Sequence, residues 1–273
     1  MISMRDAAIT IDDRNMDILE VKTKTALVRS RIPGVEYVIN PYTGCGHGCR
    51  YCYAVFMRKY SRQHKKAEWG SFVEVKINIV DVLRDELSRK RKTGTAMLSS
   101  VCDPYQPTER RYRLTRQCIE ALREHGWAID VLTRSALVTR DTDLLASCIG
   151  ASVGFSIPTD NDDVRKVLEP SSPTIGSRVH ALQQLHEAGI RTWVFIAPML
   201  PMNSERLAGL ILPYIDHAMV DPINYRNQVA PLYRKHGWDY ALTDEYAEKT
   251  GVELVKFLGE KASRSRKRNG VTH

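Results

Sequence analysis

The strongest constraint on the fold is a regular alternation of short apolar segments with amphipathic ones along most of the 273 residues. Apolar segments rich in β-branched residues predict strands, and apolar residues at intervals of three or four predict helices. Six predicted strands recur in this alternation, at 35–40, 96–101, 128–132, 152–157, 191–197 and 217–220. Strands that alternate with helices predict a parallel sheet with helical crossover connections.

Polar residues gather just after these strands, which favours a partial (β/α)6 barrel of the TIM type with its site at the carboxyl ends of the strands. A doubly wound open sheet is the alternative. Predicted helices lie at 54–63, 80–90, 115–124, 141–148, 178–188, 204–211 and 240–258, and a further strand at 72–77. We divide the chain into an N-terminal extension 1–34, the barrel 35–222, a helical segment 223–260 that packs on the barrel, and a basic disordered tail 261–273.

Composition places the chain among ordinary globular enzymes. Hydrophobic residues make up 43% and charged residues 26%, and no window approaches the roughly 20 apolar residues of a membrane helix. The first residues, MISMRDAAITIDDRN, carry charges where a signal peptide has its apolar stretch. We therefore expect a cytoplasmic protein with no membrane contact.

The six cysteines are unevenly distributed. Three fall within eight residues, whereas Cys102, Cys118 and Cys148 lie apart. In a reducing compartment a disulfide framework is not expected, so the pattern predicts one metal site and separate thiols. Cys118 and Cys148 fall on predicted helices, where we expect them in the core.

The clustered cysteines lie in the segment NPYTGCGHGCRYCY, which directly follows the first predicted strand. Cys45, Cys49 and Cys52 form a Cys-x3-Cys-x2-Cys pattern, and glycines between them allow the backbone to turn tightly. Thiolates hold iron–sulfur clusters, and a cubane offers four irons. Three cysteines therefore leave one iron without a protein ligand, unless a distant group supplies it.

The alternative is a zinc site. Structural zinc has four tetrahedral ligands, commonly in two separated pairs, and the sequence holds no second Cys-x2-Cys pair. His47 lies inside the loop, but with three adjacent cysteines it would form a cramped tetrahedron. The pattern favours the cluster.

The cysteine pattern, with an aromatic residue before the third cysteine, resembles the signature of the radical SAM superfamily, where SAM is S-adenosylmethionine. More narrowly, several segments resemble spore photoproduct lyase and its relatives. They run in order over about 60% of the chain, from Asn40 to Pro201. The segments are NPYTGCGHGCRYCYA, EWGSFVEVK, SSVCDPYQPTERRYRLTR, VLTRSALVTRD, GFSIPT with LEPSSPT, and AGIRTWVFIAPMLP.

The resemblance implies a 4Fe-4S cluster on Cys45, Cys49 and Cys52, with SAM chelating the fourth iron. An electron from the cluster would break a C–S bond of SAM, giving methionine and a 5′-deoxyadenosyl radical that abstracts hydrogen. The cofactors carry this chemistry, and the protein orients them. Tyr53 would lie against the adenine of SAM, and a flavodoxin- or ferredoxin-type protein would supply the electron.

Further SAM contacts are implied at other strand ends. Ser99, Ser100 and Asp103 follow one strand, where the superfamily holds the SAM amino group. A carboxylate suits an ammonium group, although Asp103-Pro104 is also typical of a turn.

Arg134 matches a position that contacts the SAM carboxylate, where lyase relatives often carry lysine; a surface arginine is the alternative. Ser156 matches a contact to a ribose hydroxyl. Ala197 matches a backbone contact to adenine.

The resemblance also suggests two catalytic candidates. Lyase enzymes place a hydrogen-donating cysteine near the strand end occupied here by Cys102. In this sequence, however, the cysteine directly precedes Asp103, whereas the lyase cysteine lies further upstream. A buried small residue is the alternative for Cys102. Tyr51 is a second candidate, for hydrogen relay.

Basic residues predict a possible type of substrate. The formal charge is +8, with clusters at 58–66, 89–92, 110–116 and 261–268. Such clusters suit phosphate backbones, although solvated surfaces explain them equally well. The first hypothesis is a radical enzyme acting on a nucleic acid base. The alternatives are a peptide or small-molecule substrate, or a non-catalytic iron–sulfur protein for electron transfer or sensing; the oligomeric state is left open.

Overall fold

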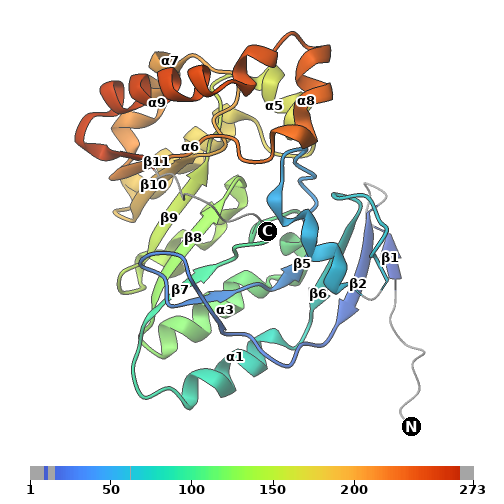
Figure 1. The fold of residues 1–273 in the computed structure, drawn as a ribbon. Helices are drawn as coiled ribbons and strands as arrows, with labels where there is room; N and C mark the ends of the chain where they lie inside the picture. The colour runs from blue at the N-terminus through green and yellow to red at the C-terminus, as the bar shows by residue number, and fades with distance from the viewer. Residues whose placement is uncertain (1–8, 12–15, 62, 265–273) are drawn as a thin grey trace.

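The computed structural model describes residues 9–11, 16–61 and 63–264 (Figure 1). Its larger sheet has the strand order β12-β11-β10-β9-β8-β7-β4-β3. These strands are β3 (Val28–Arg29), β4 (Tyr37–Ile39), β7 (Thr95–Leu98), β8 (Ala128–Thr133), β9 (Ser152–Ser156), β10 (Arg191–Ile196), β11 (His217–Val220) and β12 (Ala262–Arg264). Neighbours from β4 to β12 are parallel, and β3 is antiparallel to β4.

The six strands predicted from the sequence are confirmed as β4 and β7 to β11. They lie side by side in the order in which they occur in the chain. A doubly wound sheet reverses its order at a switch point, and no reversal occurs here, so that alternative was wrong. Within the described residues β3 and β12 do not pair with each other, so the sheet is an open, partial barrel.

A second, smaller sheet comes from the N-terminal part of the chain. Its order is β1 (Ile9–Ile11), β2 (Asp17–Val21), β6 (Phe72–Lys76) and β5 (Tyr42–Thr43). The predicted strand 72–77 is thus real, but it pairs with β2 and β5 rather than with the barrel strands. The N-terminal extension therefore contributes two strands, β1 and β2, to a sheet that also holds the start of the cysteine segment.

The helices lie between these strands. They are α1 (Ile79–Ser88), α2 (Glu109–Tyr112), α3 (Leu114–Glu124), α4 (Thr142–Ala146), α5 (Asp162–Leu168), α6 (Ile175–Glu187), α7 (Ser204–Ile211), α8 (Arg226–Lys235) and α9 (Asp244–Leu258). Short 3-10 helices are η1 (Tyr53–Tyr60), η2 (Ala136–Asp141), η3 (Leu212–Tyr214), η4 (Asp239–Leu242) and η5 (Gly259–Lys261).

Two predicted helices differ from the structure in form. The predicted helix 54–63 is the 3-10 helix η1, which ends at Tyr60. The predicted helix 240–258 is divided into η4 and α9, because the Thr243 hydroxyl accepts a hydrogen bond from the Tyr246 N–H and starts a new helix. Helices α5 and α8 were not predicted.

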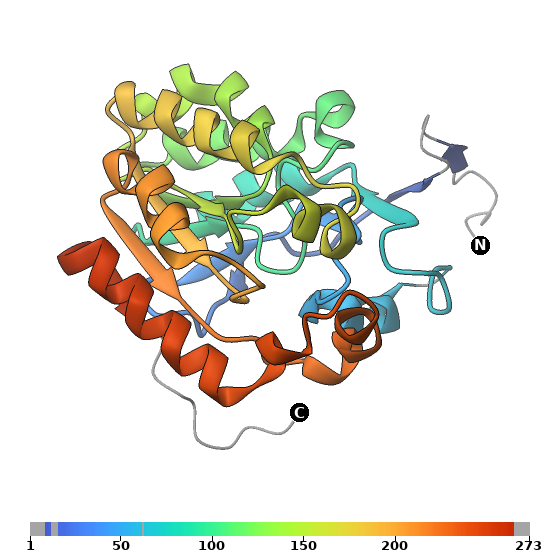
Figure 2. The ribbon, with the colours of Figure 1, turned by 90° about the horizontal axis from the view of Figure 1, so that it is seen from above.

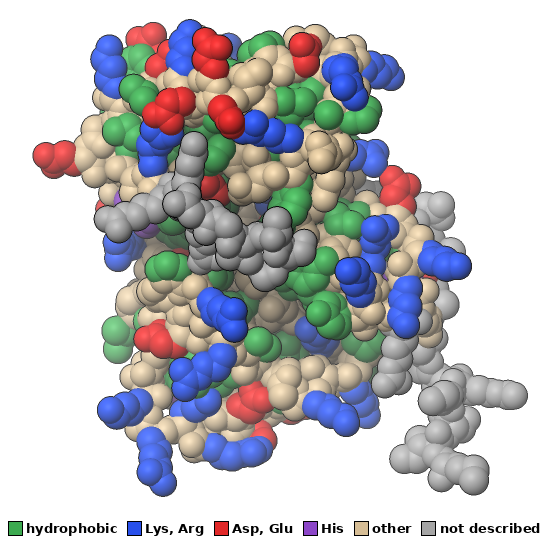
Figure 3. Space-filling view, in the orientation of Figure 1, with side chains coloured by type: hydrophobic (Ala, Val, Ile, Leu, Met, Phe, Trp, Pro, Cys, Tyr) green, Lys and Arg blue, Asp and Glu red, His purple; other side chains and the backbone are tan. Residues whose placement is uncertain are grey.

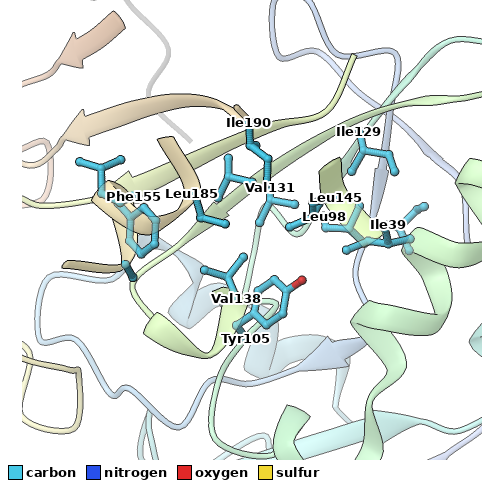
Figure 4. Packing of buried hydrophobic residues seen from close by; sticks show 14 of the residues in the cluster. Ile39, Leu98, Tyr105, Ile129, Val131, Val138, Leu145, Phe155, Leu185 and Ile190 are labelled. Carbon is cyan, nitrogen blue, oxygen red and sulfur yellow. The ribbon is translucent and has the colours of Figure 1, made fainter. Parts of the chain in front are cut away.

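Helices surround the strands in Figure 2, with α9 along one edge of the sheet. The core between sheet and helices is aliphatic (Figure 4). Ile39, Leu98, Val131 and Phe155 come from four neighbouring strands and are fully buried, and Leu185 of α6 packs in the same cluster. Burial of each such side chain stabilises the fold by about 1.5–3 kcal/mol.

The C-terminal end corrects one prediction. The tail was expected to be disordered from residue 261, yet Ala262–Arg264 form β12, which pairs in parallel with β11. The Arg264 guanidinium also donates two hydrogen bonds to Glu248, at 2.8 and 2.9 Å. The open sheet edge supplies backbone partners that the sequence did not reveal. Residues 265–273 lie outside the described residues. Within the described residues, no helix is long and apolar enough to cross a membrane.

Candidate cofactor site

The predicted site residues lie at one edge of the parallel sheet. The cysteine segment follows β4, Ser99 to Asp103 follow β7, Arg134 follows β8, and Ala197 follows β10; Ser156 is the last residue of β9. Because parallel strands all point the same way, their carboxyl ends meet at a common edge. The fold therefore brings together side chains that are far apart in the sequence.

The cysteine loop winds through consecutive tight turns. The Gly48 N–H donates to the Cys45 carbonyl at 3.3 Å, and the Cys52 N–H donates to the Cys49 carbonyl at 3.2 Å. Gly48, with φ of +59°, passes so close to Gly70 that a Cβ on Gly70 would lie 2.7 Å from the Gly48 Cα. The backbone at this point leaves no room for a side chain.

The three cysteines fit an iron–sulfur cluster by their chemistry. All are free; Cys45 and Cys49 are 8% and 7% exposed, and Cys52 is half-buried. Burial raises the pKa of each thiol, that of Cys49 to about 12, and iron binding would replace the thiol proton.

A single-ion site fits less well. Among the described residues, no group of three or more His, Cys, Asp or Glu side chains is arranged to hold one metal ion. His47, the fourth ligand considered for zinc, has its Nε2 3.3 Å from Asp103 and its Nδ1 3.3 Å from the Ser171 carbonyl. Cubane thiolates bind separate irons and need not converge on one point.

Two segments hold the cysteine loop from outside. The Gln106 Oε1 accepts a hydrogen bond from the Gly46 N–H at 2.8 Å, and its Nε2 donates to the Gly44 carbonyl at 3.3 Å. On the other side, the Arg50 N–H donates to the Leu168 carbonyl at 2.8 Å. The loop is thus fixed between Gln106, which follows β7, and Leu168, the last residue of α5.

Asp103 links three elements of the site. Its Oδ1 accepts from the Thr133 hydroxyl at 2.6 Å and from the Tyr105 N–H at 2.9 Å, and its Oδ2 accepts from the Arg134 N–H at 2.7 Å. Burial would raise the pKa of Asp103, but the charge of His47 and these hydrogen bonds lower it to about 2. The turn considered for Asp103 is therefore present, and both carboxylate oxygens already have partners in the protein.

Arg134 lies in a buried polar network with Glu169. Its Nε donates to Glu169 Oε1 at 3.0 Å, and its Nη2 donates to the Tyr51 hydroxyl at 3.2 Å. The Tyr51 hydroxyl and the Arg178 guanidinium also donate to Glu169. Arg134 is therefore an inward-facing residue, unlike the surface arginine considered as its alternative.

Ser99, Ser100 and Tyr53 lie together beside the cysteine loop. Ser99 is buried and has a positive φ of 48°, which is uncommon for a residue other than glycine. The Ser100 N–H donates to Asn40 Oδ1 at 3.0 Å, and the Tyr53 hydroxyl donates to the Ser100 carbonyl. These contacts join the end of β7 to both ends of the cysteine segment.

Cys102 packs against the cysteine loop, in the same cluster as Cys45 and Cys52. Its Sγ donates to the Tyr42 carbonyl and to the Ser99 hydroxyl, both at 3.4 Å. Burial raises the pKa of this thiol to about 11, so it is protonated at neutral pH. A protonated sulfur beside the loop is able to give up a hydrogen atom.

The other predicted residues are buried. The Ser156 hydroxyl makes no hydrogen bond among the described residues, and Ala197 is buried at the end of β10. Cys118 lies in the core on α3, as expected. Cys148 is also buried, but it follows α4 rather than lying within it.

The roles of Glu169, Arg178 and Gln106 were not predicted from the sequence. Glu169 lies in LEPSSPT, a segment noted only for its resemblance. The contact between Tyr51 and Glu169 spans 118 positions, and local patterns cannot reveal such a pairing. Covariation between the two positions would be the signal to search for.

Relatives of this chain occur in several organisms. An uncharacterised protein of Methanocaldococcus jannaschii is 34% identical over 213 residues, covering 77% of this chain and 79% of that protein. An uncharacterised protein of Mycobacterium tuberculosis is 33% identical over 195 residues, covering 68% and 57%. A protein of Pseudomonas phage M6, named radical SAM Nalpha-GlyT isomerase, is 28% identical over 162 residues, covering 59% and 32%.

Solved structures share the fold. Spore photoproduct lyase complexed with dinucleoside spore photoproduct matches with a TM-score of 0.61 at 16% identity, over 90% of this chain and 81% of the other. SuiB of Streptococcus suis bound to the precursor peptide SuiA matches with a TM-score of 0.56 at 13% identity, over 85% and 48%. At these identities the matches establish the architecture, and they confirm the likeness to spore photoproduct lyase.

The family follows from the sequence match. Residues 39–212, well over half of the chain, match the radical SAM superfamily. This segment runs from the end of β4 to the end of α7, so it includes the cysteine loop and the strand ends that surround it. The chain belongs to the radical SAM superfamily.

Proposed function

We propose that this protein is a radical SAM enzyme whose cluster is held by Cys45, Cys49 and Cys52. When bound, the cluster and SAM supply one electron and a 5′-deoxyadenosyl radical that abstracts hydrogen from a substrate. The observation that carries the proposal is the set of three free, clustered cysteines at the carboxyl edge of the parallel sheet. An external flavodoxin- or ferredoxin-type protein would be the reductant.

Several residues would orient SAM. The buried hydroxyl of Ser156 has no protein partner and is free to bind a ribose hydroxyl. Arg134 would bind the SAM carboxylate through guanidinium N–H groups other than those that donate to Glu169 and Tyr51. Tyr53 would lie against adenine, with Ala197 contributing backbone atoms.

Ser99 and Ser100 would hold the SAM amino group. Asp103 was also considered for this group, but its oxygens are already engaged. We therefore assign Asp103 an indirect role, in which it holds the ends of β7 and β8 against the cysteine loop.

Cys102 is our candidate for the hydrogen-atom donor. Its thiol is protonated and packs beside the loop that would hold the cluster. Tyr51 would act as a relay, although its hydroxyl hydrogen is donated to Glu169 in this structure.

A nucleic acid is the substrate that the surface favours. Beside the cysteine loop, η1 exposes Phe56 and Tyr60, at 43% and 73%. Lys59, Lys65 and Lys66 are exposed close by in the sequence, and Figure 3 shows Lys and Arg side chains gathered on the right of the molecule, where η1 lies. Aromatic faces stack on bases, and ammonium groups contact phosphates. The lyase neighbour, which is complexed with dinucleoside spore photoproduct, supports the same class.

The decisive experiment is anaerobic reconstitution with iron and sulfide, followed by dithionite and SAM, with 5′-deoxyadenosine measured by chromatography. We expect product from the wild type and none from Cys45→Ala, Cys49→Ala or Cys52→Ala. Cys118→Ala, which removes a core thiol on α3 outside the cysteine loop, is the matched control and keeps the activity. A full, reducible cluster that yields no 5′-deoxyadenosine would instead indicate an electron-transfer or sensing protein.

Binding tests address the substrate. We expect single-stranded oligonucleotides to bind at low ionic strength and to dissociate as salt rises. The absence of such binding would favour a peptide or small molecule, the class represented by the peptide-bound neighbour SuiB.

A further inference from the structure

A buried cluster of charges lies against the cysteine loop. Arg134 and Arg178 both bind Glu169, and the buried Asp103 carboxylate accepts a hydrogen bond from the Arg134 N–H. The side chains of Glu169 and Arg178 are fully buried. Buried charges are costly and are normally balanced by partners, so these groups stabilise one another.

Several hydrogen bonds hold this charge cluster in place. Arg178 Nη1 donates to the Ser156 carbonyl at 2.9 Å, and its other nitrogens donate to the Pro173 carbonyl at 2.9 and 3.1 Å. Glu169 is thus held by an arginine that is itself fixed to the end of β9 and to the segment before α6. Rigid charges exert a defined field on their surroundings.

The cysteine loop that would hold the iron–sulfur centre lies next to this charge cluster. Tyr51, which binds both Glu169 and Arg134, lies between Cys49 and Cys52 in the chain. Cys49 Sγ is 3.9 Å from the Ser172 hydroxyl, in the segment that carries Glu169.

We propose that Arg134 and Glu169 shift the reduction potential of the iron–sulfur cluster in opposite directions. This inference rests on the proposed function. Reduction adds one electron to the cluster and therefore one negative charge. Arg134 stabilises the reduced form and raises the potential, whereas Glu169 destabilises it and lowers the potential. Net charge and local polarity are established determinants of cluster potentials, and both act strongly in a buried site.

Redox titration tests the proposal directly. The reconstituted protein is titrated anaerobically with dithionite, without SAM, and the reduced cluster is followed by electron paramagnetic resonance. We expect Arg134→Gln to move the midpoint to more negative potential and Glu169→Gln to move it to more positive potential. Arg84→Gln, which removes an exposed arginine paired with Glu124, is the matched control and leaves the midpoint unchanged.

Arg134→Lys separates charge from hydrogen bonding. It keeps the positive charge but loses the planar guanidinium, so its midpoint should stay closer to the wild type than that of Arg134→Gln. If Glu169→Gln does not fold, the comparison of Arg134→Lys with Arg134→Gln still tests the proposal. Shifts of Arg134→Gln and Glu169→Gln in the same direction, or an Arg134→Gln midpoint equal to that of Arg84→Gln, would overturn the proposal.

The failure of this inference is distinguishable from that of the proposed function. If the wild type binds the cluster and cleaves SAM while the midpoints do not move, only the electrostatic assignment is wrong. If the wild type takes up no iron, the proposed function and this inference both fall.

Discussion

The Gln106 side chain brackets the cysteine loop by accepting a hydrogen bond from the Gly46 N–H at 2.8 Å, while its Nε2 donates to the Gly44 carbonyl. Gln106 is fully buried, so no water is available to replace it. The terminal amide carries an acceptor and a donor on neighbouring atoms, so this one neutral side chain serves both backbone groups. The glutamine therefore fixes the backbone on both sides of the first cysteine.

Gln106→Leu should weaken cluster binding. The change leaves the Gly46 N–H buried without a partner, at a cost of about 1–3 kcal/mol, and frees the loop that carries Cys45. We expect less iron per chain after reconstitution and a lower melting temperature. Gln117→Leu is the control, because Gln117 also donates to backbone carbonyls but lies on α3. Equal iron content in the two variants would refute the role of Gln106.

Gly70→Ala should disturb the same loop from another side. A Cβ at this position would lie 2.7 Å from the Gly48 Cα, and the φ of +102° is itself unfavourable for alanine. We expect a loss of about 1–3 kcal/mol in unfolding free energy together with reduced iron content. Gly176→Ala, where a Cβ meets nothing within 4 Å, should leave both unchanged or raise stability slightly. Thermal unfolding and iron analysis of the two variants distinguish these outcomes.

The sequence predicted the barrel strands well because each is a short, largely apolar run between amphipathic segments. Segments such as 128–132 and 191–197 agree with β8 and β10 to within one residue at each end. Helix α5 was missed although Asn161, its N-cap, accepts a hydrogen bond from the Asp163 N–H. At seven residues the helix is too short for a clear apolar period.

Long-range pairing explains what the sequence could not predict. Strand β6 was recognised, but its partner β2 lies in a segment with no clear strand signal. In the site, strand-end residues were found because parallel strands share an edge. Glu169 and Gln106 were not, because each reaches the cysteine loop from a remote part of the chain.

Cys102→Ala should leave the cluster intact. Cys102 packs beside the loop but donates to the Tyr42 carbonyl and the Ser99 hydroxyl, and it lies outside the Cys-x3-Cys-x2-Cys pattern. We expect the wild-type iron content and continued formation of 5′-deoxyadenosine from SAM, with the defect confined to the substrate product. Loss of iron comparable to that of Cys45→Ala would identify Cys102 as a ligand.

The pKa of Glu169 predicts where acid destabilises the fold. Burial alone would raise this pKa, but the charges of Arg178 and Arg134 and their hydrogen bonds lower it from an ordinary 4.5 to about 2. A carboxyl group whose pKa is lower in the folded state adds stability above the unfolded pKa, and this contribution is lost as pH falls through the folded pKa. Glu169 should therefore stabilise the protein fully above about pH 5 and progressively less between pH 4.5 and 2.

Glu169→Gln isolates this contribution in the cluster-free protein. Removal of the carboxylate leaves buried Arg178 and half-buried Arg134 without their shared anion, a loss of about 3–5 kcal/mol at neutral pH. We expect the difference in unfolding free energy between wild type and variant to shrink as pH falls from 4.5 towards 2, as measured by denaturant unfolding. Glu124→Gln, at an exposed ion pair with Arg84, should show little difference at any pH, because exposed pairs contribute little. A Glu169→Gln deficit that stays constant across this range would mean that the carboxylate is not held ionised by the two arginines.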